Sequence, residues 1–396
     1  MKIGMILDYV FPPDPRVENE AIALVNAGHE VFLFCLNYDD QPDFELINGI
    51  HVCRYASNTL EYKLSALAYT VPFYTQLMSR KIQSFAKTYA ISCFHIHDIR
   101  IAEAVYKVNA NLGLPVVLDL HDNLPEVMKL YPHLQKFPGK YIISPQKWKE
   151  KEAVFIEKAD RVVTVSQEFI NEVKERIPST TDKIHLVPNT VRTSFYKAAM
   201  IDQAILERYK DAFVLLYLGD THIRRGLQTA IAAIPALSKY IPNLKLVIVG
   251  SNTTDTILKK QVAQLGAEAF VDFEGWQNVA LFPSYIEAST LCLSPLHRNI
   301  QHDVAYANKL FQYMSFAKPL LVSDATAQKN LIERVGSGFV HTERDVTDFV
   351  DKVLELEKNP QLCAAMGERG KAFIENEFCW EKASQNLVHL YDNLLG

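Results

Sequence analysis

Residues 3–36, with the sequence IGMILDYVFPPDPRVENEAIALVNAGHEVFLFCL, decide the fold class of this chain. The stretch begins and ends with apolar runs, at residues 3–7 and 31–36, that are typical of buried strands. Between them, Asp14 stands before a proline as an N-cap, and Gly28 stands where a helix C-cap belongs. A strand, a helix and a strand in so short a stretch predict parallel pairing with a right-handed crossover.

The same alternation continues along the whole chain. A first series of apolar runs predicts buried strands at residues 50–55, 93–96, 116–120, 161–165 and 184–187. A second series predicts them at residues 213–218, 244–249, 269–273, 290–293 and 319–322. A polar stretch at residues 192–210 separates the two series. The sequence therefore predicts an α/β protein with two Rossmann-like, doubly wound parallel-sheet domains facing a central cleft, the first over residues 1–197 and the second over residues 205–378.

The composition excludes several classes of protein. Its 41 Lys and Arg nearly balance 46 Asp and Glu, so a nucleic-acid partner is not expected. The six cysteines form no Cys-x-x-Cys pair, which favours free thiols in a reducing compartment. No apolar run approaches the roughly 18 residues of a membrane span, and the first run stops at Asp8, too early for a signal peptide. We therefore expect a cytoplasmic protein.

A candidate diphosphate site lies at residues 219–226, between a predicted strand and a predicted helix. Gly219 and Gly226 would let backbone N–H groups approach an anion, and the following helix would add a partial positive charge. Arg225 would supply a full positive charge. The alternative is an ordinary turn with solvated arginines.

A second candidate lies at residues 308–319, on a short helix before a strand. Lys309 would neutralise phosphate, and Gln312, three residues later on the same face, would hydrogen-bond a sugar hydroxyl. A solvated helix face is the alternative. Gly275 closes the strand-like run 271–275, which is also the pattern of any strand that ends in a glycine turn.

Taken together, these segments resemble the family 4 glycosyltransferases of the GT-B type. Residues 217–227 resemble the phosphate loop of that family, and residues 308–324 resemble the end of its Glu-x7-Glu element. Three N-terminal segments, PDPRVE at residues 13–18, HIHD at 95–98 and LDLHD at 118–122, are also similar to segments of the family.

The resemblance implies the following activity. A sugar would pass from a nucleoside diphosphate sugar (a UDP- or GDP-sugar), bound by the C-terminal domain, to a glycan or lipid-linked acceptor, bound by the N-terminal domain. The anomeric configuration would be retained, and no metal would take part, consistent with the lack of an Asp-x-Asp motif or a His/Cys ligand cluster. A final helix, residues 379–396, would pack back onto the N-terminal domain. Such an enzyme would serve polysaccharide biosynthesis.

The resemblance also assigns roles to individual residues. The catalytic candidates are His97, His121, Arg225 and Lys309. The donor-binding candidates are Gly219, Arg225, Gly226, Lys309, Gln312 and Gly275. Each of the two histidines ends a predicted strand, where ligands gather in open α/β sheets. A family histidine at such a strand end contacts the donor sugar, and the local motif slightly favours His97, although either side chain alone is as readily structural.

The chain departs from the family pattern at three positions of its C-terminal half, and its N-terminal loop has Pro12 and Pro13 where many members have paired glycines. Asp220 stands where the phosphate loop usually has arginine, and Gln312 and Val304 stand where the two glutamates usually lie. His302 and Asp303 lie close enough in sequence to take over hydroxyl contacts. The departures keep two alternatives open: a catalytically silent subunit of a glycosylation complex that binds a nucleotide sugar or glycan, and, less favoured, a sugar-nucleotide epimerase.

One segment is strongly biased in charge. Residues 129–151 contain six lysines and a single acid, Glu150. Aromatic side chains, among them Phe137, Tyr141 and Trp148, are interleaved with the lysines. Such a surface can hold anionic lipid headgroups, so we expect a peripheral site on the inner face of a membrane as one possibility and a solvated loop as the other.

Overall fold

The opening segment folds as the sequence predicts. In the computed structural model, which describes residues 1–131, 134, 136–137 and 139–394, it forms β1 (Lys2–Ile6), α1 (Pro15–Asn26) and β2 (Glu30–Asn37). The Asp14 carboxylate accepts a hydrogen bond from the Val17 N–H at 3.1 Å and so caps α1. Gly28 adopts a φ of 88°, in the left-handed region, and turns the chain into β2, which pairs in parallel with β1.

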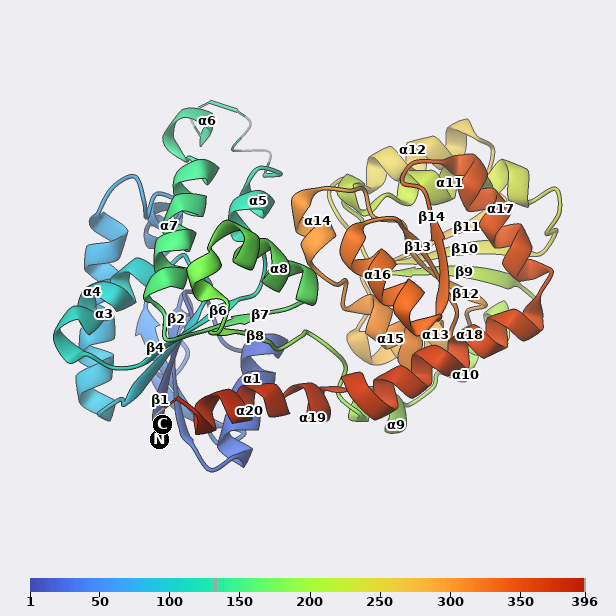
Figure 1. Cartoon of the computed structure of the whole chain (residues 1–396). Helices are drawn as coiled ribbons and strands as arrows, with labels where there is room; N and C mark the ends of the chain where they lie inside the picture. Colours follow the sequence, from blue (N-terminus) through green and yellow to red (C-terminus); the bar gives the residue numbers. More distant parts are fainter. Residues whose placement is uncertain (132–133, 135, 138, 395–396) are drawn as a thin grey trace. The chain divides into compact units, whose positions relative to one another are not determined.

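The chain divides into two units (Figure 1). The first comprises Met1–Pro188 and Ser384–Gly396. Its sheet has the strand order β3-β4-β2-β1-β5-β6-β7-β8, in which every described neighbouring pair is parallel except β3 with β4. Its other strands are β3 (Phe44–Ile47), β4 (Ile50–Ala56), β5 (Cys93–His97), β6 (Val116–Leu120), β7 (Arg161–Thr164) and β8 (Ile184–Leu186). Its other helices are α2 (Thr59–Ser65), α3 (Phe73–Tyr89), α4 (Ala102–Leu112), α5 (Leu124–Met128), α6 (Gly139–Ile142), α7 (Pro145–Lys158), α8 (Gln167–Arg176) and α20 (Gln385–Asp392).

The second unit, Asn189–Ala383, has an all-parallel sheet of order β11-β10-β9-β12-β13-β14. Its strands are β9 (Phe213–Leu218), β10 (Leu244–Val249), β11 (Val271–Gly275), β12 (Leu291–Ser294), β13 (Leu320–Ser323) and β14 (Gly338–His341). Its helices are α9 (Ser194–Lys197), α10 (Gln203–Tyr209), α11 (Leu227–Leu237), α12 (Asp255–Gln264), α13 (Phe282–Glu287), α14 (Ile300–Val304), α15 (Lys309–Ser315), α16 (Thr326–Val335), α17 (Val346–Glu357), α18 (Pro360–Phe373) and α19 (Trp380–Ala383).

The sheet of the second unit is covered on both faces. Successive side chains of β10 alternate between two hydrophobic cores: Leu246 and Ile248 pack in one, and Val247 and Val249 in the other. Helices α11 and α17 cover the first face, and α13, α15 and α16 cover the second. The predicted fold class, two doubly wound α/β domains, is therefore confirmed.

The boundaries of the units differ from the expected ones. Residues 189–197 belong to the second unit, because Val191 is buried in its core and the Val191 carbonyl accepts a hydrogen bond from the Trp380 N–H at 2.8 Å. Residues 379–383 also belong to the second unit, since Cys379 is buried in its core. Of the predicted final helix, residues 379–396, only the part from residue 384 onward belongs to the first unit, where α20 contacts α1 and β8. Leu395 and Gly396 lie outside the described residues.

Candidate functional site

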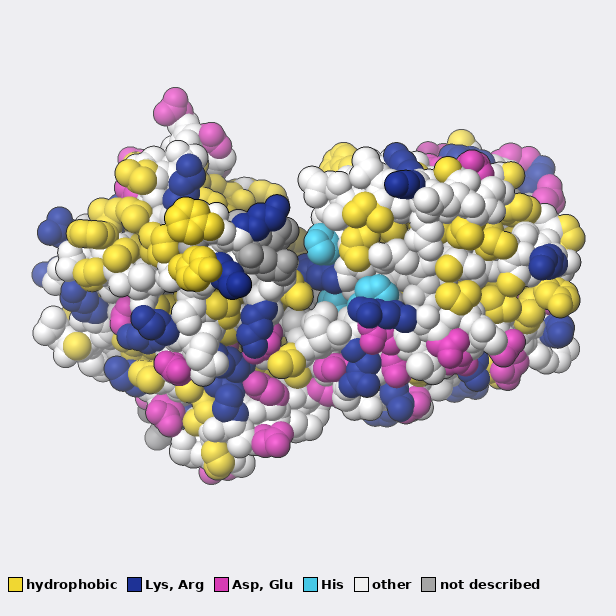
Figure 2. Space-filling model, turned by 90° about the horizontal axis from the view of Figure 1, so that it is seen from above, with side chains coloured by type: hydrophobic (Ala, Val, Ile, Leu, Met, Phe, Trp, Pro, Cys, Tyr) yellow, Lys and Arg dark blue, Asp and Glu magenta, His cyan; other side chains and the backbone are white. Residues whose placement is uncertain are grey.

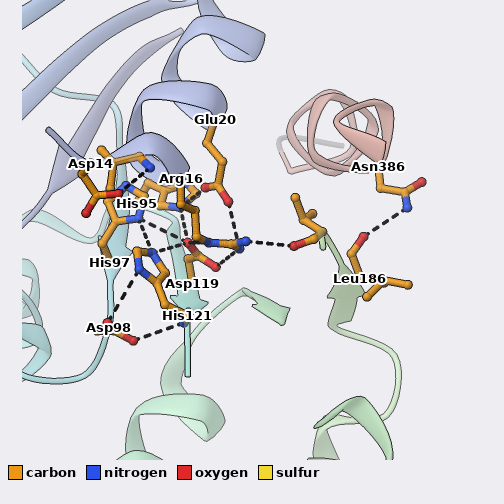
Figure 3. Close-up of polar contacts among 12 residues, drawn as sticks. Asp14, Arg16, Glu20, His95, His97, Asp98, Asp119, His121, Leu186 and Asn386 are labelled. Carbon is orange, nitrogen blue, oxygen red and sulfur yellow. Dashed lines mark hydrogen bonds and ion pairs between the residues drawn. The ribbon is translucent and has the colours of Figure 1, made fainter. Parts of the chain in front are cut away.

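Charged and imidazole side chains of the first unit gather at the carboxyl ends of two neighbouring strands (Figure 3). They come from β5 and β6, from the residue that follows each of these strands, and from α1, which lies against the strand ends. The members of this group, which we call the charge network, are His95, His97, Asp98, Asp119, His121, Arg16 and Glu20. All but Asp98 and His121 are buried.

Asp119 is the centre of the charge network. Arg16 donates to both of its oxygens, from Nε at 3.0 Å and from Nη2 at 2.5 Å. His121 Nε2 lies 2.7 Å from the same carboxylate. Burial alone would raise the pKa of Asp119, but Arg16 and His121 outweigh it and hold that pKa well below its usual range. The carboxylate is therefore ionised and paired on two sides.

The two candidate histidines occupy different environments. Burial would lower the pKa of His121, but the carboxylates of Asp119 and Asp98 raise it to about 10, so His121 is an imidazolium. Burial lowers the pKa of His97 to about 4 in spite of its contact with Asp119, so His97 is neutral. The side chain of His121 is 16% exposed, whereas His97 is 1% exposed. Of the two, His121 is the one that a ligand of this unit can reach.

Asp98 is a candidate that sequence reasoning missed. Its Oδ1 accepts a hydrogen bond from the His121 N–H at 3.1 Å, and its Oδ2 lies 3.7 Å from His121 Nδ1. Its side chain remains 28% exposed, and burial raises its pKa to about 6. The sequence signal for this residue was its place directly after a strand that contains two histidines. Asp98 adopts a φ of 61°, which aspartate tolerates better than most residues. Such a carboxyl can exchange a proton near neutral pH.

Four buried members of the network bring potential metal-ligand atoms together. Ligand atoms of Glu20, His95, His97 and Asp119 all lie within 4.8 Å of one another. The positive charge at this point is already supplied by Arg16, whose Nη2 lies 2.8 Å from Glu20 Oε1 and 2.5 Å from Asp119 Oδ1. A metal ion would have to displace this guanidinium, so the residues fit a charge-paired network better than a metal site.

In the second unit, the predicted diphosphate segments meet at the carboxyl edge of the sheet. Gly219 follows β9 with a φ of 111°, and a Cβ there would stand 3.5 Å from Lys309 Nζ. Gly226 has a φ of 75°, and a Cβ there would stand 1.7 Å from the Pro295 carbonyl oxygen. Only glycine fits at Gly226, and the turn and α15 are brought together as the sequence predicts.

Lys309 is buried and points its ammonium group across the face of an aromatic ring. Its Nζ lies 3.4 Å from the centre of the Tyr217 ring. Within the part of the chain that the structure describes, this Nζ has no hydrogen-bond partner. Burial, with a smaller effect from Arg225, holds the pKa of Lys309 well below its usual range. A buried donor group of this kind is expected to bind an anion.

Arg225 stands beside the residue that departs from the family pattern. Its Nε lies 3.4 Å from Asp220 Oδ2, and Asn252 Nδ2 donates to Asp220 Oδ1 at 2.6 Å. Burial opposes the effect, but Arg225 and these hydrogen bonds lower the pKa of Asp220. Asp220 therefore holds a negative charge against the arginine that would bind phosphate.

The remaining donor-side candidates lie near this edge. Gly275 ends β11 with a φ of 67°, and its carbonyl accepts a hydrogen bond from the Gly250 N–H at 2.7 Å. Gly250 in turn packs against Gly219 so closely that a Cβ would stand 2.0 Å from the Gly219 oxygen. Gln312 lies on α15, partly exposed, three residues after Lys309.

Asp303 has a structural role. It accepts a hydrogen bond from the Thr326 N–H at 2.8 Å and pairs with Arg298 at 3.2 Å. This carboxylate therefore holds α14 against α16, and it is not the free hydroxyl acceptor that its place in the sequence suggested.

Both halves of the chain match models of glycosyltransferase families. A model described as Glycosyltransferase Family 4 matches residues 16–195, and one described as Glycosyl transferases group 1 matches residues 201–373. A Bacillus subtilis (strain 168) protein described as a glycosyltransferase, EpsD, is 25% identical over 228 residues, covering 54% of this chain and 55% of that protein. The N-acetyl-alpha-D-glucosaminyl L-malate synthase of Bacillus anthracis is 22% identical over 380 residues, covering 94% of this chain and 91% of the synthase.

Solved structures share the fold over the full length. Sucrose-phosphate synthase from Thermosynechococcus elongatus has a TM-score of 0.80 at 17% identity, covering 100% of this chain and 99% of that one. Anabaena HepE in complex with UDP has a TM-score of 0.73 at 14% identity, covering 99% of this chain and 100% of that one. The architecture is therefore that of the GT-B glycosyltransferases.

Proposed function

This chain belongs to the family 4 glycosyltransferases, because the two family models together match both of its halves. We propose that it transfers a hexosyl group from a UDP- or GDP-sugar to a hydroxyl of a glycan or lipid-linked acceptor. The observation that carries the proposal is the buried ammonium group of Lys309, which has no hydrogen-bond partner among the described residues and lies beside the Gly219 turn. A diphosphate fits there because its oxygens accept from Lys309, Arg225 and the backbone of the turn.

In this proposal, catalysis consists mainly of stabilising the leaving group. As the bond between the sugar and the diphosphate breaks, negative charge grows on the diphosphate oxygens. Arg225 supplies positive charge at that point, and the bound diphosphate opposes the effect of burial on the pKa of Lys309 and favours its charged form, so the proposed reaction needs no metal ion. Transfer that persists in excess EDTA supports this part of the proposal, and transfer that EDTA abolishes and Mg²⁺ or Mn²⁺ restores contradicts it.

We assign the acceptor side of the reaction to the exposed rim of the charge network. His121 and Asp98 present an imidazolium and a carboxyl with a pKa raised to about 6. The carboxyl is suited to bind, and to take a proton from, the attacking hydroxyl. Retention of configuration rests on the resemblance of residues 217–227 and 308–324 to the family, and NMR of the anomeric proton of the product measures it.

A panel of ligands tests the proposal. Wild-type protein is heated with UDP, GDP and ADP and with their hexose esters, and a ligand at about 100 times its Kd should stabilise by about 2.7 kcal/mol. Lys309→Met should abolish the shift, whereas Lys260→Met, on the exposed face of α12, should keep it. The absence of a shift with any nucleotide would overturn the proposal. Binding without transfer or hydrolysis would identify a silent subunit instead.

We further propose that the first unit docks on a membrane with anionic lipids. Large apolar side chains on α2, on and just before α6, and at the start of α3 are exposed, among them Leu60, Phe73, Phe137, Tyr141 and Ile142. The Thr70 hydroxyl donates to the Ile142 carbonyl at 2.9 Å, which holds the segment between α2 and α3 against α6. Figure 2 shows hydrophobic and basic side chains side by side on this face of the unit. In the part of the chain that the structure describes, no helix is long and apolar enough to cross a bilayer.

The structure reduces the predicted lysine segment to a smaller set. Lys129, Lys149 and Lys151 pair with acidic residues of the same unit. Trp148 is 2% exposed and packs on the Tyr69 ring, so it belongs to the core and not to a membrane surface. The lysines left to meet anionic headgroups are Lys136, Lys140 and Lys147, all exposed.

Vesicle binding tests this docking. The triple variant Lys136→Glu, Lys140→Glu, Lys147→Glu should lose binding to vesicles that contain phosphatidylglycerol, since each lysine contributes about 1 kcal/mol near such a surface. The matched triple variant in the second unit, Lys239→Glu, Lys259→Glu, Lys260→Glu, should bind as the wild type does. Equal binding by wild type and the first variant would overturn the docking proposal.

A further inference from the structure

His302 is a buried histidine that the proposed function does not use. It lies beside the turn at residues 219–226, which we call the phosphate turn. His302 lies on α14, which follows β12, and β12 is the neighbour of β9 in the sheet. The turn at residues 223–226 contacts the loop between β12 and α14, because the His297 N–H donates to the Arg224 carbonyl at 3.0 Å. His302 is 4% exposed.

The contacts of His302 fix which ring nitrogen carries the proton. Nδ1 lies 2.6 Å from the His297 carbonyl oxygen and 3.0 Å from Asn299 Nδ2, and that amide has the same carbonyl oxygen as an acceptor at 3.3 Å. A carbonyl oxygen only accepts, and two acceptors would repel each other at that distance, so Nδ1 carries a hydrogen and donates it. Burial, together with Arg225, lowers the pKa of His302 to about 4, so the ring is neutral. In a neutral ring with a protonated Nδ1, Nε2 is a hydrogen-bond acceptor.

That acceptor is held in place and is not used. Among the residues that the structure describes, none donates a hydrogen bond to Nε2 of His302. The ring has little freedom to find a partner, because its Nδ1 is held by the His297 carbonyl at 2.6 Å and the residue is 4% exposed. The loop below it is also fixed, since Ser323 Oγ donates to the Leu296 carbonyl at 2.6 Å. A buried acceptor without a donor is costly unless a ligand supplies one.

The chemistry of the missing partner follows from these contacts. It must donate a hydrogen bond, which excludes an ionised phosphate oxygen. The two sugar rings that flank a diphosphate, the ribose and the transferred hexose, both carry hydroxyls, while the base lies one ring further away. We propose that His302 Nε2 accepts a hydrogen bond from a sugar hydroxyl of the nucleotide-sugar donor. This inference rests on the proposed function.

The proposal also accounts for a departure of the sequence from its family. Val304, in the place of the first glutamate of the Glu-x7-Glu element, is 7% exposed and apolar. Asp303 is held by Thr326 and Arg298. Of His302, Asp303 and Val304, His302 is the one whose side chain has a buried polar atom without a hydrogen-bond partner among the described residues.

Two isosteric variants separate Nε2 from the rest of the ring. In His302→Asn the amide N–H can still donate to the His297 carbonyl, as Nδ1 does, but nothing replaces Nε2. In His302→Gln the amide oxygen can reach the position of Nε2. Both variants are compared with wild type by calorimetric binding of pyrophosphate, of UDP and UDP-glucose, and of GDP and GDP-mannose, with the melting temperature as a check of folding.

We expect His302→Asn to bind the nucleotide sugar about three- to tenfold more weakly, the usual effect of one neutral hydrogen bond, and His302→Gln to bind closer to wild type. Pyrophosphate should bind all three proteins equally. An equal loss for the nucleoside diphosphate identifies a ribose hydroxyl, and no loss for it identifies the transferred sugar. Unchanged binding of the nucleotide sugar to His302→Asn, or an equal loss for pyrophosphate, would overturn the role of His302. Failure of wild type to bind any nucleotide would overturn the proposed function itself.

Discussion

The charge network of the first unit and the phosphate turn of the second lie at the same place in their sheets, the carboxyl edge of parallel strands, but they handle buried charge in opposite ways. In the network, Asp119 is ionised between Arg16 and His121. Beside the phosphate turn, Lys309 of α15 is buried without a hydrogen-bond partner among the described residues. The Asp119 carboxylate is therefore neutralised within the protein, whereas the Lys309 amine is left for a ligand to pair with. We therefore expect substitutions in the network to affect folding first, and substitutions in the turn to affect binding first.

The largest effect should come from Asp119→Asn. The substitution removes the carboxylate that pairs with buried Arg16 and with the partly exposed His121, and breaking a buried pair in this way usually costs about 3–5 kcal/mol. Thermal and urea unfolding measure the loss. The exposed Asp182→Asn of the same unit is the control and should unfold as the wild type does. A stable Asp119→Asn protein would show that the network does not hold the first unit together.

Lys309→Met should show the opposite behaviour. Loss of this cation should lower transfer by about 10²–10³-fold, the usual effect of removing a donor to the developing charge. The unfolding free energy should not fall, because the variant no longer buries an unpaired ammonium group. Steady-state kinetics and calorimetry on the same samples measure both quantities. A protein that is strongly destabilised but transfers normally would contradict the comparison.

The two regions should also respond in opposite directions to pH. The pKa of His121 is raised in the folded state, so its stabilisation is complete below about pH 6.5 and is lost as pH rises toward about 10. The pKa of Lys309 is lowered, so folding of the second unit becomes easier as pH rises toward about 10.5. Hydrogen exchange followed by mass spectrometry, corrected for intrinsic rates, should show protection falling in the first unit and rising in the second between pH 7 and 9. His121→Gln and Lys309→Met should each remove one of the two trends.

The smallest effect should come from Asp220→Asn. The carboxylate of Asp220 lies 3.4 Å from Arg225 Nε and competes with a diphosphate for that arginine. Its neutralisation should tighten nucleoside diphosphate binding by about two- to tenfold, a modest change because both side chains are partly exposed. Titration calorimetry measures the affinity, and Asp220→Glu, which keeps the charge, is the control. Weaker binding by Asp220→Asn would show that the carboxylate positions Arg225 and does not compete with the ligand.

Most strands of both sheets were predictable because they are buried on both faces and read as apolar runs. The two that were missed lack that signal. Phe44–Ile47 (β3) is an edge strand whose side chains are mostly exposed. Gly338–His341 (β14) begins with a glycine that packs so closely on β13 that a Cβ would stand 2.1 Å from the Leu320 oxygen.

The site was predictable only where its parts are near in sequence. The turn at residues 219–226 and the helix of Lys309 each have a local pattern, and the sheet brings them together. Arg16 and Asp119 are 103 residues apart, and no local pattern pairs them. His121 is an imidazolium at the rim of the network, whereas His97 is a neutral ring inside it. This difference depends on burial and on the carboxylates of Asp119 and Asp98, so it likewise has no local signal in the sequence.

Tyr391, on α20, lies 2.8 Å from His95 Nδ1 and ties the charge network to the last helix described. That helix is translated after the whole of the second unit, which runs without interruption from Asn189 to Ala383. During synthesis, the second unit can therefore complete its core while it emerges, whereas the first must wait with His95 uncovered until nearly 200 further residues have left the ribosome. The unit that is made first therefore receives its last helix after the whole second unit has been made.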